Sequence, residues 1–133
     1  MVHFTSEKIM KKKILIIEDE AVLLKVLKDK FETEGWDVDT AVDGEEALKK
    51  VKESEFDLLL LDLIMPKLGG FEVIKIIRQD YEMKKIPIIV MSNLGDEDSI
   101  QKALELGASK YFVKNQHPIK DIMEKAGEFV NIN

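Results

Sequence analysis

Cysteine is absent from this sequence of 133 residues, and histidine occurs only as His3 and His117. The absence of cysteine excludes a disulfide framework, a thiolate metal site and a cysteine nucleophile, and it fits a reducing compartment. Nothing pairs the two histidines as metal ligands, so we interpret one as a tail residue and the other as a loop residue.

Long apolar runs and an excess of positive charge are also missing. A membrane span needs an uninterrupted apolar run of ~20 residues, and none is present. Residues 1–13 lack the apolar core of a secretory signal, so we expect a cytoplasmic protein without membrane partners. The 20 basic and 26 acidic side chains give a net charge of −6. This balance argues against direct nucleic-acid binding and favours proteins or small molecules as partners.

The composition is that of one globular domain. Hydrophobic residues make up 45% of the chain and charged residues 35%, which is too apolar for a disordered protein. The length leaves no room for a second domain of ordinary size. We expect a polar leader over residues 1–12 and a folded domain over residues 13–131.

Five short apolar runs alternate along the chain with segments of helical spacing. The first, third and fourth runs are almost continuous in Ile, Leu and Val, which is typical of parallel strands covered on both faces. The second run alternates with polar residues, as an edge strand does. The runs cover residues 14–17, 36–42, 56–61, 86–91 and 111–113.

Local signals place the ends of the helices. Gly35 and Gly107 stand where left-handed C-terminal caps are expected, and Asp43 with Glu46 forms an N-terminal capping pair. Pro118 suits the first turn of the last helix. The pattern is a strand followed by a helix, five times over. It predicts right-handed crossovers, a parallel sheet and a three-layer α/β sandwich.

Polar residues follow the apolar runs, at the end of the sheet where such folds place their sites. The first run is followed by Glu18, Asp19 and Glu20, and the third by Asp62. If these strands are neighbours, two carboxylates ~5 Å apart repel by about 3 kcal/mol at an effective dielectric constant near 20. Such a group calls for a cation. Ligands that are all oxygen select a hard ion such as Mg²⁺.

The fourth and fifth runs end in Ser92 and Lys114. A hydroxyl and an ammonium group are what a phosphoryl group needs opposite a metal. Asp62 is then the natural nucleophile toward phosphorus. Taken alone, Asp62 is more simply a loop or capping carboxylate and Lys114 a solvated surface charge. Ser92 alone could cap the next helix, although Asp96 or Asp98 would serve as well. The combination favours phosphoryl chemistry.

Four motifs stand out along the chain. They are ILIIEDE at residues 14–20, LLDLIMP at 60–66 with GG at 69–70, VMS at 90–92 and GASKYFVK at 107–114. Together they resemble the motifs of bacterial response regulator receiver domains, from about Lys12 to Val130. The resemblance implies a flavodoxin-like fold with five strands and helices and the parallel strand order 2-1-3-4-5. It also implies phosphorylation by a sensor histidine kinase or a histidine phosphotransfer protein.

The resemblance assigns roles by position. Asp62 would accept the phosphoryl group, and Ser92 and Lys114 would contact its oxygens. Tyr111 falls at the switch aromatic, which turns inward as the Ser92 hydroxyl moves toward the phosphoryl group, although core packing is the alternative for Tyr111. The Mg²⁺ ligands would be Glu18, Asp19, Asp62 and the backbone carbonyl of Ile64.

A receiver acts as a switch for protein interactions, not as a turnover enzyme. The resemblance points to the fourth helix, fifth strand and fifth helix as the face that binds a downstream protein or forms a phosphorylation-dependent homodimer. We expect a stand-alone receiver. The alternatives are a module of a longer regulator and a phosphorylation-independent interaction domain.

Two other classes on similar folds fit the residues less well. A haloacid-dehalogenase-like phosphatase needs a second acid two residues after its nucleophile, where this chain has Ile64. A flavodoxin-like electron carrier would present hydroxyls and backbone N–H groups to the flavin phosphate. Glu18, Asp19 and Glu20 would repel that phosphate.

The chain departs from the family pattern at three positions. Asn115 replaces the proline that many relatives carry after the fifth-strand lysine, which puts the loop geometry and the partner face near Lys114 in doubt. Ile64 and Leu94 stand where polar residues are common and flank the path of a hydrolytic water. We hypothesise that the aspartyl phosphate is shielded and long-lived.

Overall fold

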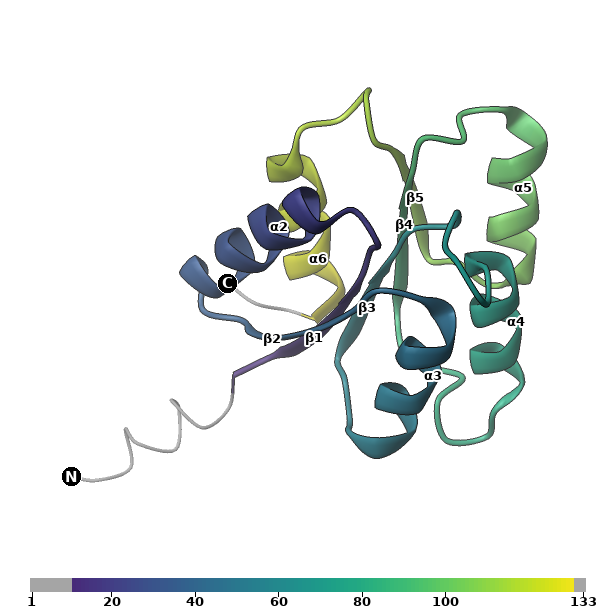
Figure 1. The fold of residues 1–133 in the computed structure, drawn as a ribbon, viewed down its shortest axis with the longest axis horizontal. Coiled ribbons are helices and arrows are strands. Elements are labelled where there is room, and N and C mark those ends of the chain that lie inside the picture. The colour runs from purple at the N-terminus through teal and green to yellow at the C-terminus, as the bar shows by residue number, and fades with distance from the viewer. Residues whose placement is uncertain (1–10, 131–133) are drawn as a thin grey trace.

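The computed structural model describes residues 11–130, in which strands and helices alternate as predicted (Figure 1). Residues 1–10 and 131–133 lie outside the described residues, and with them most of the predicted leader, residue 131 of the predicted domain and His3. The elements are β1 (Lys13–Ile17), α2 (Ala21–Thr33), β2 (Asp37–Ala41), α3 (Gly44–Glu53), β3 (Leu58–Leu61), α4 (Gly70–Gln79), β4 (Ile88–Ser92), α5 (Glu97–Leu106), β5 (Lys110–Val113) and α6 (Ile119–Val130).

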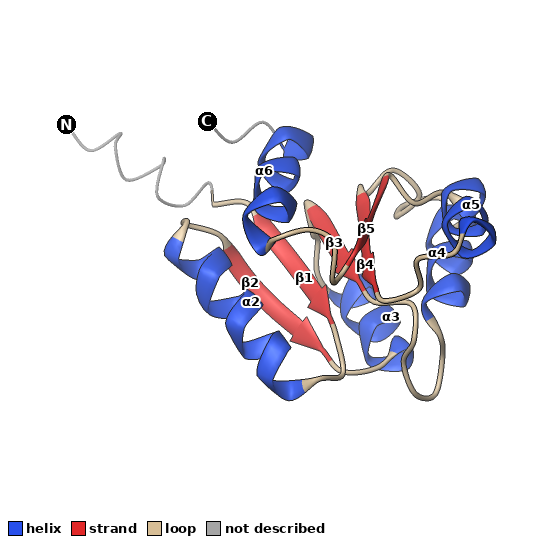
Figure 2. Cartoon of the chain, turned by 90° about the horizontal axis from the view of Figure 1, so that it is seen from above, coloured by secondary structure: helices blue, strands red, loops and turns tan. Residues whose placement is uncertain are grey.

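The five strands form one parallel sheet in the order β2-β1-β3-β4-β5, which confirms the predicted topology (Figure 2). The strand order reverses at β1, because β2 lies on one side of it and β3 on the other. β2 is an edge strand in which only Ala41 is buried, as its alternating sequence predicts. Ile17 of β1 is in register with Leu61 of β3, so these two strands end at the same level.

Helices cover both faces of the sheet (Figure 1). Side chains of the central strands alternate between the faces. Leu15 and Leu59 pack with α3, α4 and α5, whereas Ile16 and Leu60 pack with α2 and α6. A fully buried Leu or Ile contributes about 1.5–3 kcal/mol to folding, so the two cores hold the strand ends in fixed positions. Within residues 11–130, no helix is both long and apolar enough to cross a membrane.

The predicted helix boundaries agree with the structure to within a residue. Gly35 and Gly107 have φ values of +94° and +121°, which L side chains rarely adopt. The Asp43 side chain accepts a 2.8 Å hydrogen bond from the Glu46 N–H. The Glu46 carboxylate in turn accepts a 2.8 Å hydrogen bond from the N–H of Val42, and not from that of Asp43. Pro118 lies immediately before α6 and not in its first turn.

Three predicted strands, corresponding to β2, β3 and β4, begin earlier in the sequence than the observed strands do. Trp36 and Phe56 are buried but precede β2 and β3, because their rings fill the amino end of the sheet without joining the strand ladder. β4 begins at Ile88 and not at Ile86, since Pro87 has no N–H to donate to a neighbouring strand.

Candidate functional site

The predicted acidic residues meet at the carboxyl end of the sheet. Glu18 and Asp62 each continue the backbone ladder one step past their strands, with Glu18 N–H donating to Ala41 O and Asp62 N–H donating to Ile17 O, both at 3.0 Å. One carboxylate oxygen each from Glu18, Asp19 and Asp62 lies within 4.8 Å of the others. Glu18 and Asp62 are buried and Asp19 is exposed. The convergence of these three carboxylates agrees with the expectation from the strand ends.

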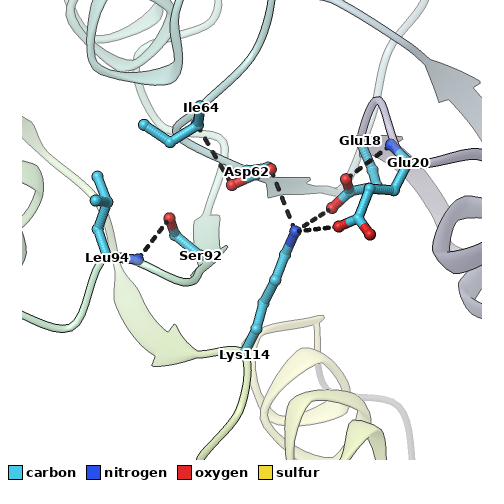
Figure 3. A network of polar contacts seen from close by, with 7 residues as sticks. All are labelled: Glu18, Glu20, Asp62, Ile64, Ser92, Leu94 and Lys114. Atoms are coloured by element: carbon cyan, nitrogen blue, oxygen red, sulfur yellow. Dashed lines mark hydrogen bonds and ion pairs between the residues drawn. The ribbon is translucent and has the colours of Figure 1, made fainter.

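Lys114 reaches these carboxylates from β5 (Figure 3). Its backbone N–H donates to Ser92 O at 2.8 Å, which fixes where the side chain begins. The Nζ atom lies 2.9 Å from Glu18 Oε1 and 3.2 Å from Asp62 Oδ2. Burial lowers the pKa of Lys114, but the contacts with Glu18 and Asp62 outweigh it and the pKa is raised. The ammonium group therefore stays charged and compensates the two buried acids.

Glu20 is a third partner of Lys114, with Oε2 3.5 Å from Nζ. From the sequence, Glu20 is expected at the end of the first strand but not among the residues that bind the metal or the phosphoryl group. Its side chain is 63% exposed, and its backbone N–H donates to Glu18 Oε2 at 3.0 Å. The length and flexibility of a lysine stem could have suggested that a third acid lies within reach, but sequence does not say which one.

Glu18 is fully buried, and both of its carboxylate oxygens are contacted, one by the Lys114 ammonium and the other by the Glu20 N–H. Burial raises its pKa, as does the neighbouring Asp62, while Lys114 and the Glu20 N–H lower it. Among the described residues, its Oε1 is the one buried side-chain oxygen or nitrogen without an aligned hydrogen bond, although the ammonium of Lys114 lies close.

Ser92 and Tyr111 both bond to Leu94 in the β4–α5 loop, and among the described residues no hydrogen bond joins either side chain to Glu18, Asp19 or Asp62. Ser92 is fully buried, and its Oγ accepts a 3.3 Å hydrogen bond from Leu94 N–H (Figure 3). The Tyr111 hydroxyl donates to Leu94 O at 2.5 Å. Burial raises the pKa of Tyr111. Asp96, and not Ser92, caps α5, with Oδ2 accepting from Ser99 N–H at 3.0 Å. The Ser92 hydroxyl is therefore not used as a helix cap.

Ile64 and Asn115 occupy two of the positions where the chain departs from the family pattern. The Ile64 N–H donates to Asp62 Oδ1 at 3.4 Å. Ile64 is 59% exposed, and its side chain is turned away from Lys114 (Figure 3). After Lys114 the chain makes a turn in which Gln116 N–H donates to Val113 O at 3.0 Å. The peptide bond before Asn115 is trans.

The donor set fits a hard divalent cation. It consists of carboxylate oxygens with no histidine or sulfur among them, and two of the three carboxylates are buried. Such ligands suit Mg²⁺, which is held by one or two carboxylates and completes its shell with water and phosphate oxygen. The acidic group at this end of the sheet could therefore hold a metal ion.

One family model and known relatives each match most of this chain. The family model described as "response regulator receiver domain" matches residues 14–126. The alkaline phosphatase synthesis transcriptional regulatory protein PhoP of Bacillus subtilis is 43% identical over 109 residues, which are 82% of this chain and 45% of PhoP. The transcriptional regulatory protein ResD of the same organism is 36% identical, with 87% of this chain and 50% of ResD covered. The chain thus spans about half the length of these curated relatives.

Solved structures resemble the fold over most of its length. The receiver domain of Francisella response regulator 1452 has a TM-score of 0.85 at 27% identity, with 91% of this chain and 98% of that chain covered. The phosphorylated cyanobacterial phytochrome response regulator RcpA has a TM-score of 0.81 at 30% identity, with 91% and 94% covered. Both likenesses therefore cover about nine tenths of this chain.

Proposed function

The chain belongs to the response regulator receiver family of two-component signalling, and on that premise we propose that Asp62 accepts a phosphoryl group from a phosphohistidine. The observation that carries this proposal is the position of the Asp62 carboxylate. It is buried at the end of a central strand, within 4.8 Å of Glu18 and Asp19 and 3.2 Å from the Lys114 ammonium. Fold alone would not give this function, which rests on the chemistry of the site.

The transfer step is a displacement at phosphorus. A carboxylate oxygen of Asp62 forms the new P–O bond as the P–N bond to the donor histidine breaks, and the histidine nitrogen leaves with the electron pair. Lys114 provides a fixed positive charge for the phosphoryl oxygens, and Ser92 provides a hydroxyl donor. Because Lys114 already lies between Glu18 and Asp62, it needs only a short shift to meet the incoming group.

We assign the metal ligands to Glu18, Asp19, Asp62 and the backbone carbonyl of Ile64. Bound Mg²⁺ would neutralise charge on the nucleophile and on the phosphoryl oxygens, which otherwise repel each other. The proximity of the three carboxylates, two of which are buried, supports this assignment.

The switch would begin at Ser92. To reach a phosphoryl group on Asp62, its hydroxyl must leave the Leu94 N–H, and the Tyr111 hydroxyl is bonded to the carbonyl of the same Leu94. Movement of the β4–α5 loop therefore involves both side chains. The surface formed by α5, β5 and α6 is the proposed binding face for a downstream protein or for a phosphorylation-dependent homodimer.

A stand-alone receiver in the cytoplasm, which binds a target protein or relays its phosphoryl group to another, remains our first proposal for the whole protein. The second candidate is a receiver module of a longer regulator. It is favoured by the coverage of only 45% of PhoP, which is named a transcriptional regulator. Immunodetection of the protein in lysate from its source cells distinguishes the two, since a regulator of PhoP-like length would be about twice as long as this chain.

The test of phosphorylation is intact mass after incubation with acetyl phosphate, with and without Mg²⁺. We expect one phosphoryl adduct per chain that needs both Mg²⁺ and Asp62, with Asp62→Asn as the control. A stoichiometric adduct without continued turnover of the donor would fit a switch better than an enzyme. If neither acetyl phosphate nor the phosphoryl mimic beryllofluoride reacted with or bound the folded protein, a phosphorylation-independent interaction domain would replace this proposal.

A further inference from the structure

The loop after Asp62 contains a strained turn at Lys67. Lys67 has a φ of +66° and is the sole residue other than glycine with a positive φ between residues 11 and 130. Leu68 N–H donates to Pro66 O at 2.8 Å, which closes a γ-turn around Lys67. Turns of this kind are rare and strained, and they persist where the surroundings hold them. Some other part of the molecule must therefore keep the loop in this shape.

Asp43, at the start of α3, is in contact with this turn. Its Oδ2 lies 3.6 Å from Lys67 Nζ, while its Oδ1 accepts the capping hydrogen bond from Glu46 N–H. The Asp43 side chain is 10% exposed, so its charge is largely withdrawn from water. One carboxylate thus caps a helix with one oxygen and pairs with the loop of the proposed site with the other.

Gly44 brings the backbones of the helix and the loop together. A Cβ atom at Gly44 would lie 2.1 Å from Leu68 O and 2.8 Å from Leu68 C. Both are backbone atoms, which cannot move aside as the end of a flexible side chain can. Glycine is therefore required here so that α3 can begin directly against the loop.

The same turn supports the other acidic segment. Ala41 O, two residues before Asp43, accepts the hydrogen bond from Glu18 N–H. Residues 41–44 therefore contact both the segment that carries Glu18 and the loop that follows Asp62. We call residues 41–44 the β2–α3 turn.

We propose that the β2–α3 turn, through Asp43 and Gly44 with their partner Lys67, positions the two acidic segments for metal and phosphoryl binding. These are positioning residues, and the inference rests on the proposed function of Asp62. The carboxylates repel each other, so a segment that is free to move would separate them and lose the arrangement a cation needs. Because the β2–α3 turn holds both segments, the acids stay close together although the turn itself contributes no ligand.

The variant Lys67→Met tests this proposal, because an electrostatic role and a positioning role of Lys67 predict opposite changes in Mg²⁺ affinity. Removal of a positive charge near an acidic site should strengthen Mg²⁺ binding if only long-range electrostatics acts. Loss of the Asp43 contact should instead loosen the loop, and we expect Mg²⁺ affinity to fall by about three- to tenfold. The measurement is titration of the folded protein with MgCl₂, followed by calorimetry or by amide chemical shifts.

Two further variants distinguish a positioning role of the β2–α3 turn from an effect of charge and from a loss of helix capping. Gly44→Ala changes no charge and should weaken Mg²⁺ binding at least as much as Lys67→Met. Asp43→Asn is compared with Asp96→Asn, because Asp96 caps α5 through a similar hydrogen bond to Ser99 N–H at 3.0 Å. We expect only the Asp43 variant to lower Mg²⁺ affinity. If Gly44→Ala does not fold, Lys67→Met decides the matter.

Amide hydrogen exchange in EDTA provides a readout that needs no metal. Amides of residues 63–69 should exchange faster in Lys67→Met than in the wild type, while those of the β4–α5 loop should not change. Unchanged exchange, or Mg²⁺ affinity equal to or above that of the wild type, would overturn the inference. If the wild-type protein bound no Mg²⁺, the proposed function would be contradicted. The exchange rates in EDTA would still show whether the β2–α3 turn holds the loop.

Discussion

The two halves of the site differ in how far the fold alone assembles them. On β1 and β3, Glu18 and Asp62 are fixed by the strand ladder and share the ammonium of Lys114 at 2.9 and 3.2 Å. On β4, Ser92 lies at the same end of the sheet, but its hydroxyl accepts a 3.3 Å hydrogen bond from its own loop. The charged half, formed by the acids and Lys114, is therefore assembled on folding. The hydroxyl half, formed by Ser92, is bonded within its own loop, and under the proposed function a phosphoryl group would draw the Ser92 hydroxyl away from Leu94.

The largest expected effect comes from removing the charge that holds the acidic half together. Lys114→Met leaves Glu18 and Asp62 buried without a counter-charge, so the free energy of unfolding in EDTA should fall by about 2–4 kcal/mol. The rate of adduct formation should fall by about 100-fold or more. Urea unfolding and timed intact mass measure the two effects. Lys120→Met, at an exposed position on α6, is the control, and an equal loss in both variants would contradict the role of Lys114.

Ser92→Ala should impair the hydroxyl half of the site and leave the charged half intact. The rate of adduct formation should fall by about ten- to 100-fold, because a donor to the phosphoryl oxygens is lost. Stability in EDTA should change by about 1 kcal/mol or less, since only a long hydrogen bond disappears. Ser92→Thr keeps the hydroxyl and should retain more of the rate. A clear loss of Mg²⁺ affinity in Ser92→Ala would show that the halves are not independent.

The apolar residues beside the site should slow the return to the unphosphorylated state. Ile64→Asn and Leu94→Glu each place a polar group beside the path of water. We expect dephosphorylation to accelerate by roughly three- to tenfold, less than the full effect of a placed general base. Ile64→Val and Leu94→Met are the matched controls. If the polar variants lose phosphate no faster than these controls, the shielding hypothesis is wrong.

The smallest effect concerns the pH dependence of the acidic half. Burial raises the pKa of Glu18 above its usual 4.5, so the folded state binds a proton more tightly than the unfolded state. In EDTA, the Glu18 contribution to stability should therefore decline as pH rises from about 4.5 through the folded pKa. Glu18→Gln removes this contribution at every pH. The urea midpoint of the variant, relative to that of the wild type, should therefore rise as the pH increases over that range. A constant difference from pH 4.5 to 7 would contradict the raised pKa.

Most of the fold follows from local sequence signals. Continuous apolar runs identified the central strands, the alternating run identified β2 as an edge, and Asp43 and Gly107 marked helix ends. These features are determined by residues close together in sequence. The starts of β2 and β3 were misplaced because Trp36 and Phe56 are buried without pairing in the ladder, which apolar character alone does not reveal.

The backbone positions of the site were predictable for the same reason, since strand ends in a parallel sheet share one edge. Contacts made by long side chains were not. The pairing of Glu20 with Lys114 depends on how a four-carbon stem crosses from β5 to the β1–α2 loop. The contact of Asp43 with Lys67 likewise depends on a strained turn for which the sequence carries no glycine as a signal. From the sequence, Asp43 is predicted only as a helix cap, whereas in the structure its other carboxylate oxygen also pairs with Lys67.

The most direct measurement is a set of amide chemical shifts for the isotope-labelled protein in EDTA, in Mg²⁺, and in Mg²⁺ with beryllofluoride, which mimics the phosphoryl group. Mg²⁺ alone should shift the amides around Glu18, Asp62 and Ile64 and leave Ser92, Leu94 and Tyr111 nearly unchanged. Addition of beryllofluoride should then shift the second group. A second group that responds fully to Mg²⁺ alone, or not at all to beryllofluoride, would contradict a site whose charged half is assembled before its hydroxyl half.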